Sequence, residues 1–106
     1  PKSLAETFAL KALYKKYQND IDFVSIFLES KSPNEAFKQR VLKEIIWPVY
    51  SLGYYHPIWK TLNVGTFPYY VLINKNSTIE SLPALGPIPN GLYETIDKTF
   101  HKVTIR

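Results

Sequence analysis

The sequence predicts an α/β fold in which helices cover a small mixed sheet. Three observations favour this class. Amphipathic helix patterns alternate along the chain with short apolar runs that are typical of strands. Two strand-like runs flank a polar turn, which indicates an antiparallel hairpin. The chain has 106 residues, of which 45% are hydrophobic, and this is enough for one domain with one core.

The first helix is predicted over residues 3–17, "SLAETFALKALYKKY". Ser3 and Glu6 form the S-x-x-E capping-box pattern, in which each side chain bonds an unpaired amide at the start of a helix. Apolar residues recur at helical spacing and predict the buried face. These residues are Leu4, Phe8, Ala12, Leu13 and Tyr17.

The apolar run Phe23–Leu28 predicts a strand buried on both faces, as in parallel sheets that helices cover. A second helix should follow it, with Ser32 as N-cap, Pro33 at the first position and Glu35 at N3. Its predicted buried face contains Phe37, Val41, Leu42, Ile45 and Ile46. Pro48 stops this helix because the residue before a proline disfavours the helical conformation.

Residues 48–65 are rich in aromatic side chains and are interrupted by Gly53 and Pro57. We predict an irregular segment here, with one short helix over residues 57–63 that begins at Pro57. Core packing is the common role of large aromatic side chains. An exposed surface that binds a partner is the alternative, because Tyr and Trp often anchor interfaces. The candidates for such an aromatic surface are Trp47, Tyr50, Tyr54, Tyr55 and Trp59.

The C-terminal part predicts a hairpin followed by a helix. The predicted elements are a strand over 68–73, a turn over 74–77, a strand over 78–82, a loop over 83–91 and a helix over 92–103. Asn90 is the expected cap of that helix, and Leu92, Ile96 and Phe100 form its apolar face. Pro68 has no N–H to donate, which suits the first residue of a strand, an edge or a bulge.

Charge and composition exclude several classes of function. The net charge of +4 is spread along the chain, so we expect a solvated surface and no nucleic-acid partner. No cysteine is present, which excludes disulfides, thiolate metal sites and cysteine nucleophiles within these residues. His56 and His101 lie in different segments, so we expect no metal site and no cofactor. No apolar run is long enough to predict a membrane span.

The segment Val64–Ile79, "VGTFPYYVLINKNSTI", resembles the y-x-v-x-x-x-P-x-x-x-L-I-d-x-x-G-x-I segment of TlpA/ResA-type (AhpC/TSA-like) thiol–disulfide oxidoreductases. The segment "LKALYKKYQNDIDFVSIFLE" is similar to their first helix and second strand. These enzymes belong to the thioredoxin-like superfamily, and the resemblance extends over nearly the whole chain. It implies a three-layer α/β/α domain over residues 1–106 with a mixed sheet, truncated at the N-terminal strand.

The resemblance also implies a binding site. Pro68 falls on the cis-proline position of the family, where the edge of the strand pairs with an extended substrate. Thr66, Phe67 and Pro68 would then line a peptide groove, and the Phe67–Pro68 bond would be cis. A trans proline that simply opens a strand is the alternative. The resemblance places the protein in the periplasm or otherwise outside the cytoplasm.

The family's Cys-x-x-Cys motif is absent, and without a thiolate and a resolving sulfur no dithiol chemistry is possible. We therefore expect no catalytic residue in this chain and a role in binding an extended peptide or protein partner. One alternative is an active oxidoreductase whose cysteines precede Pro1. Another is an assembly in which a partner, or a homodimer, supplies the strand that this chain lacks.

Overall fold

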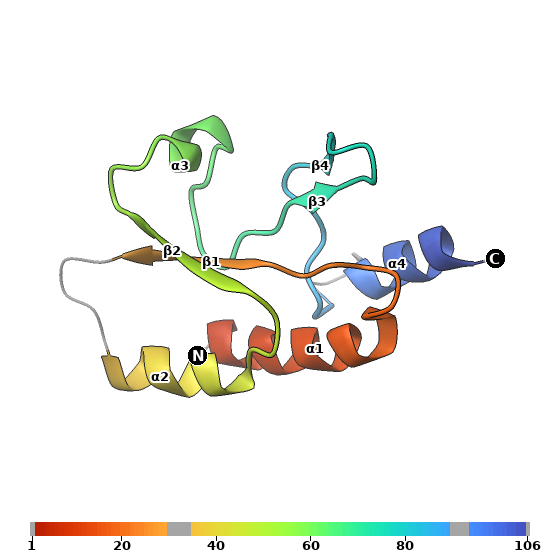
Figure 1. Ribbon diagram of the computed structural model, residues 1–106, viewed down its shortest axis with the longest axis horizontal. Helices are drawn as coiled ribbons and strands as arrows, with labels where there is room; N and C mark the ends of the chain where they lie inside the picture. The colour runs from red at the N-terminus through yellow and green to blue at the C-terminus, as the bar shows by residue number, and fades with distance from the viewer. Residues whose placement is uncertain (1, 30–34, 90–93, 106) are drawn as a thin grey trace. The chain divides into compact units, whose positions relative to one another are not determined.

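The computed structural model describes residues 2–29, 35–89 and 94–105, and it confirms the mixed α/β class (Figure 1). The elements are α1 Lys2–Tyr17, β1 Ser25–Glu29, α2 Glu35–Glu44, β2 Val49–Gly53, α3 Ile58–Thr61, β3 Leu72–Ile73, β4 Ile79–Ser81 and α4 Ile96–Thr104. The chain forms two compact units, Pro1–Pro57 (the first unit) and Ile58–Arg106 (the second unit). That both units belong to one domain stays a prediction.

Helix α1 forms over nearly the predicted residues, and Leu4, Leu13 and Tyr17 of its predicted apolar face are buried. It begins at Lys2, so Ser3 lies inside the helix and is not its N-cap. The buried residues include Leu4, Glu6, Thr7, Leu13 and Tyr17. Phe8, predicted to be buried, is 48% exposed. Since Phe8 lies about two and a half turns before Tyr17, the two side chains point to opposite sides of the helix.

The first unit contains a parallel pair of strands, β1 and β2. Ile26 lies opposite Tyr50, and Leu28 lies opposite Leu52. The backbone N–H of Ser25 donates to the carbonyl of Pro48 at 3.0 Å, directly before β2. Strand β1 was predicted, but the segment that forms β2 was predicted to be irregular.

Among the described residues, the face of β1 that carries Val24 and Ile26 remains largely exposed, which corrects the prediction of a strand buried on both faces. On the covered face, Ser25 accepts a hydrogen bond from Trp47, which follows α2. The ammonium of Lys38, which belongs to α2, lies 6.0 Å from the ring centroid of Phe27. On the alternate side, Val24 and Ile26 are 57% and 40% exposed. Figure 1 shows α1 and α2 running along the same side of the β1–β2 pair.

Three aromatic rings form the centre of the first unit. Tyr14, Phe23 and Trp47 lie with ring centroids 5.3–5.4 Å apart in tilted and edge-to-face arrangements. Such arrangements are the favoured ones for aromatic pairs. The indole N–H of Trp47 donates to the Ser25 hydroxyl at 2.8 Å, so the polar atom of this side chain is satisfied.

Helix α2 packs on α1 and ends earlier than predicted. The ammonium of Lys11 on α1 donates to the Glu44 carboxylate at 3.0 Å, at the last residue of α2. Val41 is buried as predicted, whereas Ile46 lies beyond the helix and is 47% exposed. The predicted caps Ser32 and Pro33 lie outside the described residues.

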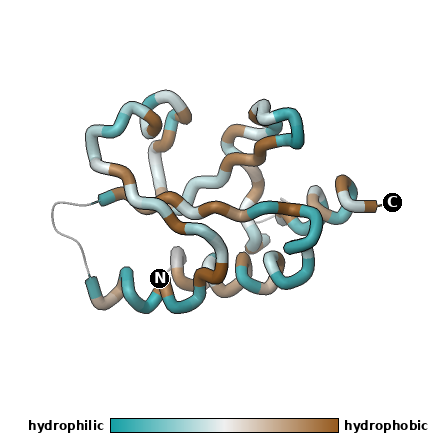
Figure 2. Tube along the Cα trace, viewed as in Figure 1, coloured by the Kyte–Doolittle hydropathy of each residue, from teal (hydrophilic) through white to brown (hydrophobic). Residues whose placement is uncertain are grey.

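The second unit contains the predicted hairpin in a shorter form. Strands β3 and β4 pair antiparallel, with Leu72 opposite Ser81 and Ile73 opposite Ile79. Figure 2 shows the apolar strand β3 leading into the hydrophilic turn that joins it to β4. The turn closes through Ser77 N–H to Asn74 C=O and Asn74 N–H to Thr78 C=O, each at 2.9 Å. Ser77 adopts φ 64°, as in a hairpin whose type I turn is followed by a left-handed residue.

Helix α4 forms as predicted over much of its length. Thr95 occupies the N-cap position with extended backbone, and the Ile96 N–H donates to the Gly86 carbonyl at 2.9 Å. Ile96 and Phe100 are buried, which confirms two residues of the predicted face. The predicted cap Asn90 and the third residue of that face, Leu92, lie outside the described residues. The peptide bonds that precede Pro68 and Pro83 are cis.

Candidate functional site

The candidate site begins where helix α3 ends. Asn63 follows the helix with φ 56°, in the left-handed region that Asn tolerates better than most residues. The Asn63 N–H donates to the Lys60 carbonyl at 3.0 Å, and the Val64 N–H donates to the Trp59 carbonyl at 2.8 Å. This pair of bonds is the Schellman arrangement, which satisfies the last carbonyls of a helix. It fixes the direction in which the chain leaves α3.

A side-chain hydrogen bond then closes the segment that follows. The Tyr69 hydroxyl donates to the Leu62 carbonyl at 2.7 Å, across a sequence separation of 7. We call residues 62–69 the closed loop. Compact surface loops whose ends are close together often carry function. Phe67 and Pro68 lie within this loop, directly before the tyrosine that closes it.

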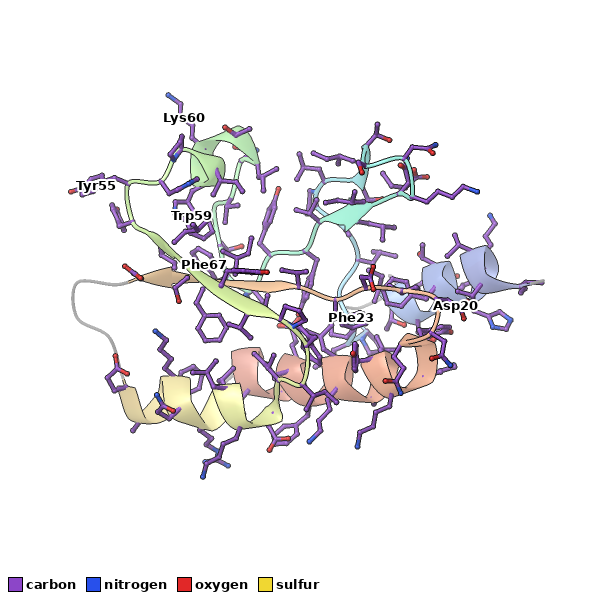
Figure 3. The ribbon with its side chains drawn as sticks, viewed as in Figure 1. Asp20, Phe23, Tyr55, Trp59, Lys60 and Phe67 are labelled. Atoms are coloured by element: carbon purple, nitrogen blue, oxygen red, sulfur yellow. The ribbon has the colours of Figure 1, made fainter. Side chains whose placement is uncertain are left out.

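Phe67 is held against Trp59 but remains accessible to solvent. The two rings are edge-to-face, with centroids 6.0 Å apart and an interplanar angle of 77°. Phe67 is nevertheless 52% exposed, so much of the ring is free to contact a ligand. Figure 3 shows the Trp59 side chain directed from α3 toward Phe67. The closed loop therefore presents an aromatic surface whose orientation is already fixed.

The other predicted groove residues lie on the same loop. Thr66 is exposed and Pro68 is half-buried. Among the described residues of the second unit, no hydrogen bond engages the backbone of Thr66 or Phe67. An extended peptide could therefore pair with these groups without displacing an existing bond. Residues 66–68 form a bend and not a regular strand.

The residues of the predicted aromatic surface differ in how exposed they are in the structure. Trp47 is only 7% exposed and belongs to the core of the first unit, so for this residue the packing role holds and the surface alternative does not. Tyr50, Tyr54 and Tyr55 are exposed, and the last two rings meet edge-to-face at 5.1 Å. Trp59 is half-buried and belongs to the closed-loop site.

Two residues that organise the site, Asn63 and Tyr69, were not predicted from the sequence. Asn63 directly follows a short helix, and an asparagine in this position is a known sign of a left-handed helix end. Tyr69 was read only as a strand residue, and nothing in the local pattern reveals that its hydroxyl reaches back to Leu62. The first residue was therefore detectable from the sequence, and the second was not.

Neither histidine belongs to this site. His56 and His101 are both exposed, and His101 lies in the last turn of α4. Within the described ranges, no group of three or more His, Cys, Asp or Glu side chains is arranged to hold a metal ion. No helix in the same ranges has the length and apolar character required to cross a membrane.

Comparison of the chain with known proteins identifies no relative. No protein-family model, no curated protein and no solved structure matches the chain. The assignment to the thioredoxin-like superfamily therefore stays a prediction from the sequence.

Proposed function

We propose that this chain is a thioredoxin-like domain without redox chemistry that binds an extended peptide segment of a partner protein. The binding site is the edge formed by Thr66, Phe67 and Pro68. The protein acts outside the cytoplasm, and its three-layer α/β/α arrangement follows the family that the sequence resembles. Binding requires no cofactor, and no residue of this chain performs covalent catalysis.

One observation carries this proposal: Phe67 is half exposed although its ring is held by Trp59. An exposed aromatic ring usually loses conformational freedom when a ligand binds it, and this loss reduces affinity. Here the contact with Trp59 restricts the ring before binding. The open backbone at Thr66 and Phe67 adds hydrogen-bonding groups of the kind that bind extended peptides.

The experiment is a selection of peptides from a displayed random library on the immobilised protein, followed by affinity measurements on the selected peptides. Phe67→Ala should weaken their binding by about tenfold or more, since central aromatic side chains contribute most of the energy at interfaces. The matched control is Ile79→Ala, because Ile79 lies in the same unit and is 49% exposed, close to the 52% of Phe67. This control should bind the peptides as the unaltered chain does.

Two results would contradict the proposal. One is equal loss of affinity in Phe67→Ala and Ile79→Ala, which would show that Phe67 has no special role. The other is a selection that yields no peptide whose binding depends on residues 66–68. Thermal unfolding of both variants shows whether a change in affinity reflects the site or a loss of folded protein.

A further inference from the structure

The closed loop depends on one hydroxyl group. Tyr69 donates to the Leu62 carbonyl at 2.7 Å, and both residues flank the segment that carries Phe67. On the N-terminal side, the loop is already fixed, because the Val64 N–H bonds the Trp59 carbonyl at 2.8 Å. On the C-terminal side, the Tyr69 hydroxyl is the group that ties the loop back to the end of α3.

We propose that Tyr69 is the positioning residue of the closed loop: its hydroxyl holds Phe67 in edge-to-face contact with Trp59. This inference deepens the proposed function and rests on it for the consequence for peptide affinity. The arrangement of the loop itself is independent of any ligand. In this role Tyr69 contacts no ligand and acts only through Phe67.

The geometry supports this role in two ways. Trp59 is fixed because it lies in α3 and its carbonyl takes part in the helix end. Phe67 has no comparable anchor: among the described residues of the second unit, no hydrogen bond engages its backbone. The position of Phe67 must therefore follow from the closure of the loop, and the side chain that closes it stands two positions later.

The charge and polarity of the bond also fit a positioning role. A neutral hydroxyl–carbonyl bond contributes modestly to stability, so its loss should open the loop without unfolding the unit. Leu62 is half-buried and Tyr69 is half-buried, so the bond is not fully exposed to competing water. Removing the hydroxyl should therefore change the order of the loop more than the global stability.

The test uses Tyr69→Phe, which removes the hydroxyl and keeps the ring. The chain contains two tryptophans, Trp47 and Trp59, so Trp47→Phe leaves Trp59 as the sole tryptophan, whose fluorescence can be excited selectively over that of the tyrosines. In this background, Tyr69→Phe should raise the quenching of Trp59 by acrylamide toward the value of Phe67→Ala. The control Tyr70→Phe removes the same atom one residue later and should leave the quenching unchanged.

A second measurement avoids the Trp47 substitution if that variant folds poorly. In the otherwise unaltered chain, we expect the ring of Phe67 to shift the NMR signals of the Trp59 indole protons, because the two rings are in edge-to-face contact. Tyr69→Phe should move these signals toward their positions in Phe67→Ala. A merely structural role for Tyr69 would lower the unfolding temperature and leave both the quenching and the indole shifts of the folded protein unchanged.

The outcomes separate this inference from the proposed function. Unchanged quenching and unchanged indole shifts in Tyr69→Phe would overturn the positioning role, regardless of the affinity of this variant for the peptides. If both readouts change, the role stands, and peptide affinity then tests the site. We expect affinity for the selected peptides to fall about fivefold in Tyr69→Phe, the loss that corresponds to one neutral hydrogen bond. Unchanged affinity in a variant with an opened loop would reject the site at Phe67 and keep the role of Tyr69.

Discussion

The contacts within the first unit and those within the second unit differ in how far apart in the sequence their partners lie. In the first unit, the bonds connect residues that are distant in sequence: Trp47 bonds Ser25 at a separation of 22, and Lys11 bonds Glu44 at a separation of 33. In the second unit, side-chain bonds such as that from Tyr69 to Leu62, at a separation of 7, connect nearer neighbours. Asn74 and Thr78 are separated by only 4.

This difference indicates how each unit should respond to substitution. Contacts between distant segments form together, so the loss of one central side chain should affect the whole first unit. Local turns and helix ends form from their own sequence, so a change in one of them should affect only that element. The second unit also carries the candidate site, whose closed loop is held by the local bond from Tyr69 to Leu62.

The largest effect is expected for Trp47→Ala. Trp47 is 7% exposed and contacts both Tyr14 and Phe23, so its removal leaves a cavity and should cost about 3–5 kcal/mol. A loss of this size is a large fraction of the stability of a small domain. Urea unfolding, followed by near-UV circular dichroism, measures it.

The same variant tests whether the units respond separately. Hydrogen exchange should show faster exchange in α1 and β1, whereas the turn amides of Asn76 and Thr78 should keep their protection. Trp47→Phe is the control, since it keeps an aromatic ring and loses only the indole bond to Ser25. Equal deprotection of the hairpin and α1 in Trp47→Ala would contradict a separate response of the two units.

An intermediate effect is expected for Asn74→Ala. The Asn74 side chain accepts from Asn76 N–H at 2.9 Å and Thr78 N–H at 3.2 Å, and donates to Thr78 Oγ1 at 2.6 Å and Glu80 Oε2 at 3.3 Å. Losing these bonds at an exposed turn should cost about 1–2 kcal/mol. Hydrogen exchange at Ile73 and Ile79 reports on the hairpin directly.

The control for this substitution lies in the same turn. Asn76→Ala should have little effect, because within the described residues Asn76 contributes its backbone N–H, which alanine retains. If Asn76→Ala destabilises the hairpin as much as Asn74→Ala, the side-chain bonds of Asn74 are not what holds the turn. Loss of order in α1 after Asn74→Ala would show that the effect of this substitution is not confined to the hairpin.

The smallest effect is expected for Lys11→Ala. The Lys11 and Glu44 side chains are 29% and 25% exposed, and partly exposed ion pairs contribute about 0.2–1 kcal/mol. The difference in unfolding free energy from the unaltered chain should shrink in about 1 M salt, which screens the pair. Lys15→Ala removes an exposed lysine from the same helix and serves as control. A salt-independent cost for Lys11→Ala would assign its role to packing of the alkyl chain.

Local signals explain which elements the sequence could predict. The helix near Pro57 and the turn at Asn74 depend on neighbouring residues, and both were found. Strand β2 was missed because its pairing with β1 joins Val49 to Ser25, residues far apart in the chain. The exposure of Phe8 was missed for a related reason, since the packing partners of a helix determine which of its apolar faces is buried.

The candidate site follows the same rule. Phe67 was singled out through a resemblance, but its contact with Trp59 depends on how α3 ends and how the loop closes. Asn63 could have been recognised from its place after a short helix. The bond from Tyr69 to Leu62 depends on where a flexible hydroxyl meets a carbonyl, and no residue pattern encodes that.

Ser77 adopts a positive φ of 64°, a conformation that is costly for a side chain with a Cβ atom. The hairpin therefore forms despite an unfavourable residue at its tip, with Asn74 compensating from the base of the turn. Ser77→Gly should therefore raise the free energy of unfolding by about 1 kcal/mol. Ser77→Gly is therefore the first substitution to make when a more stable protein around the closed loop is wanted, and it leaves Phe67 unaltered.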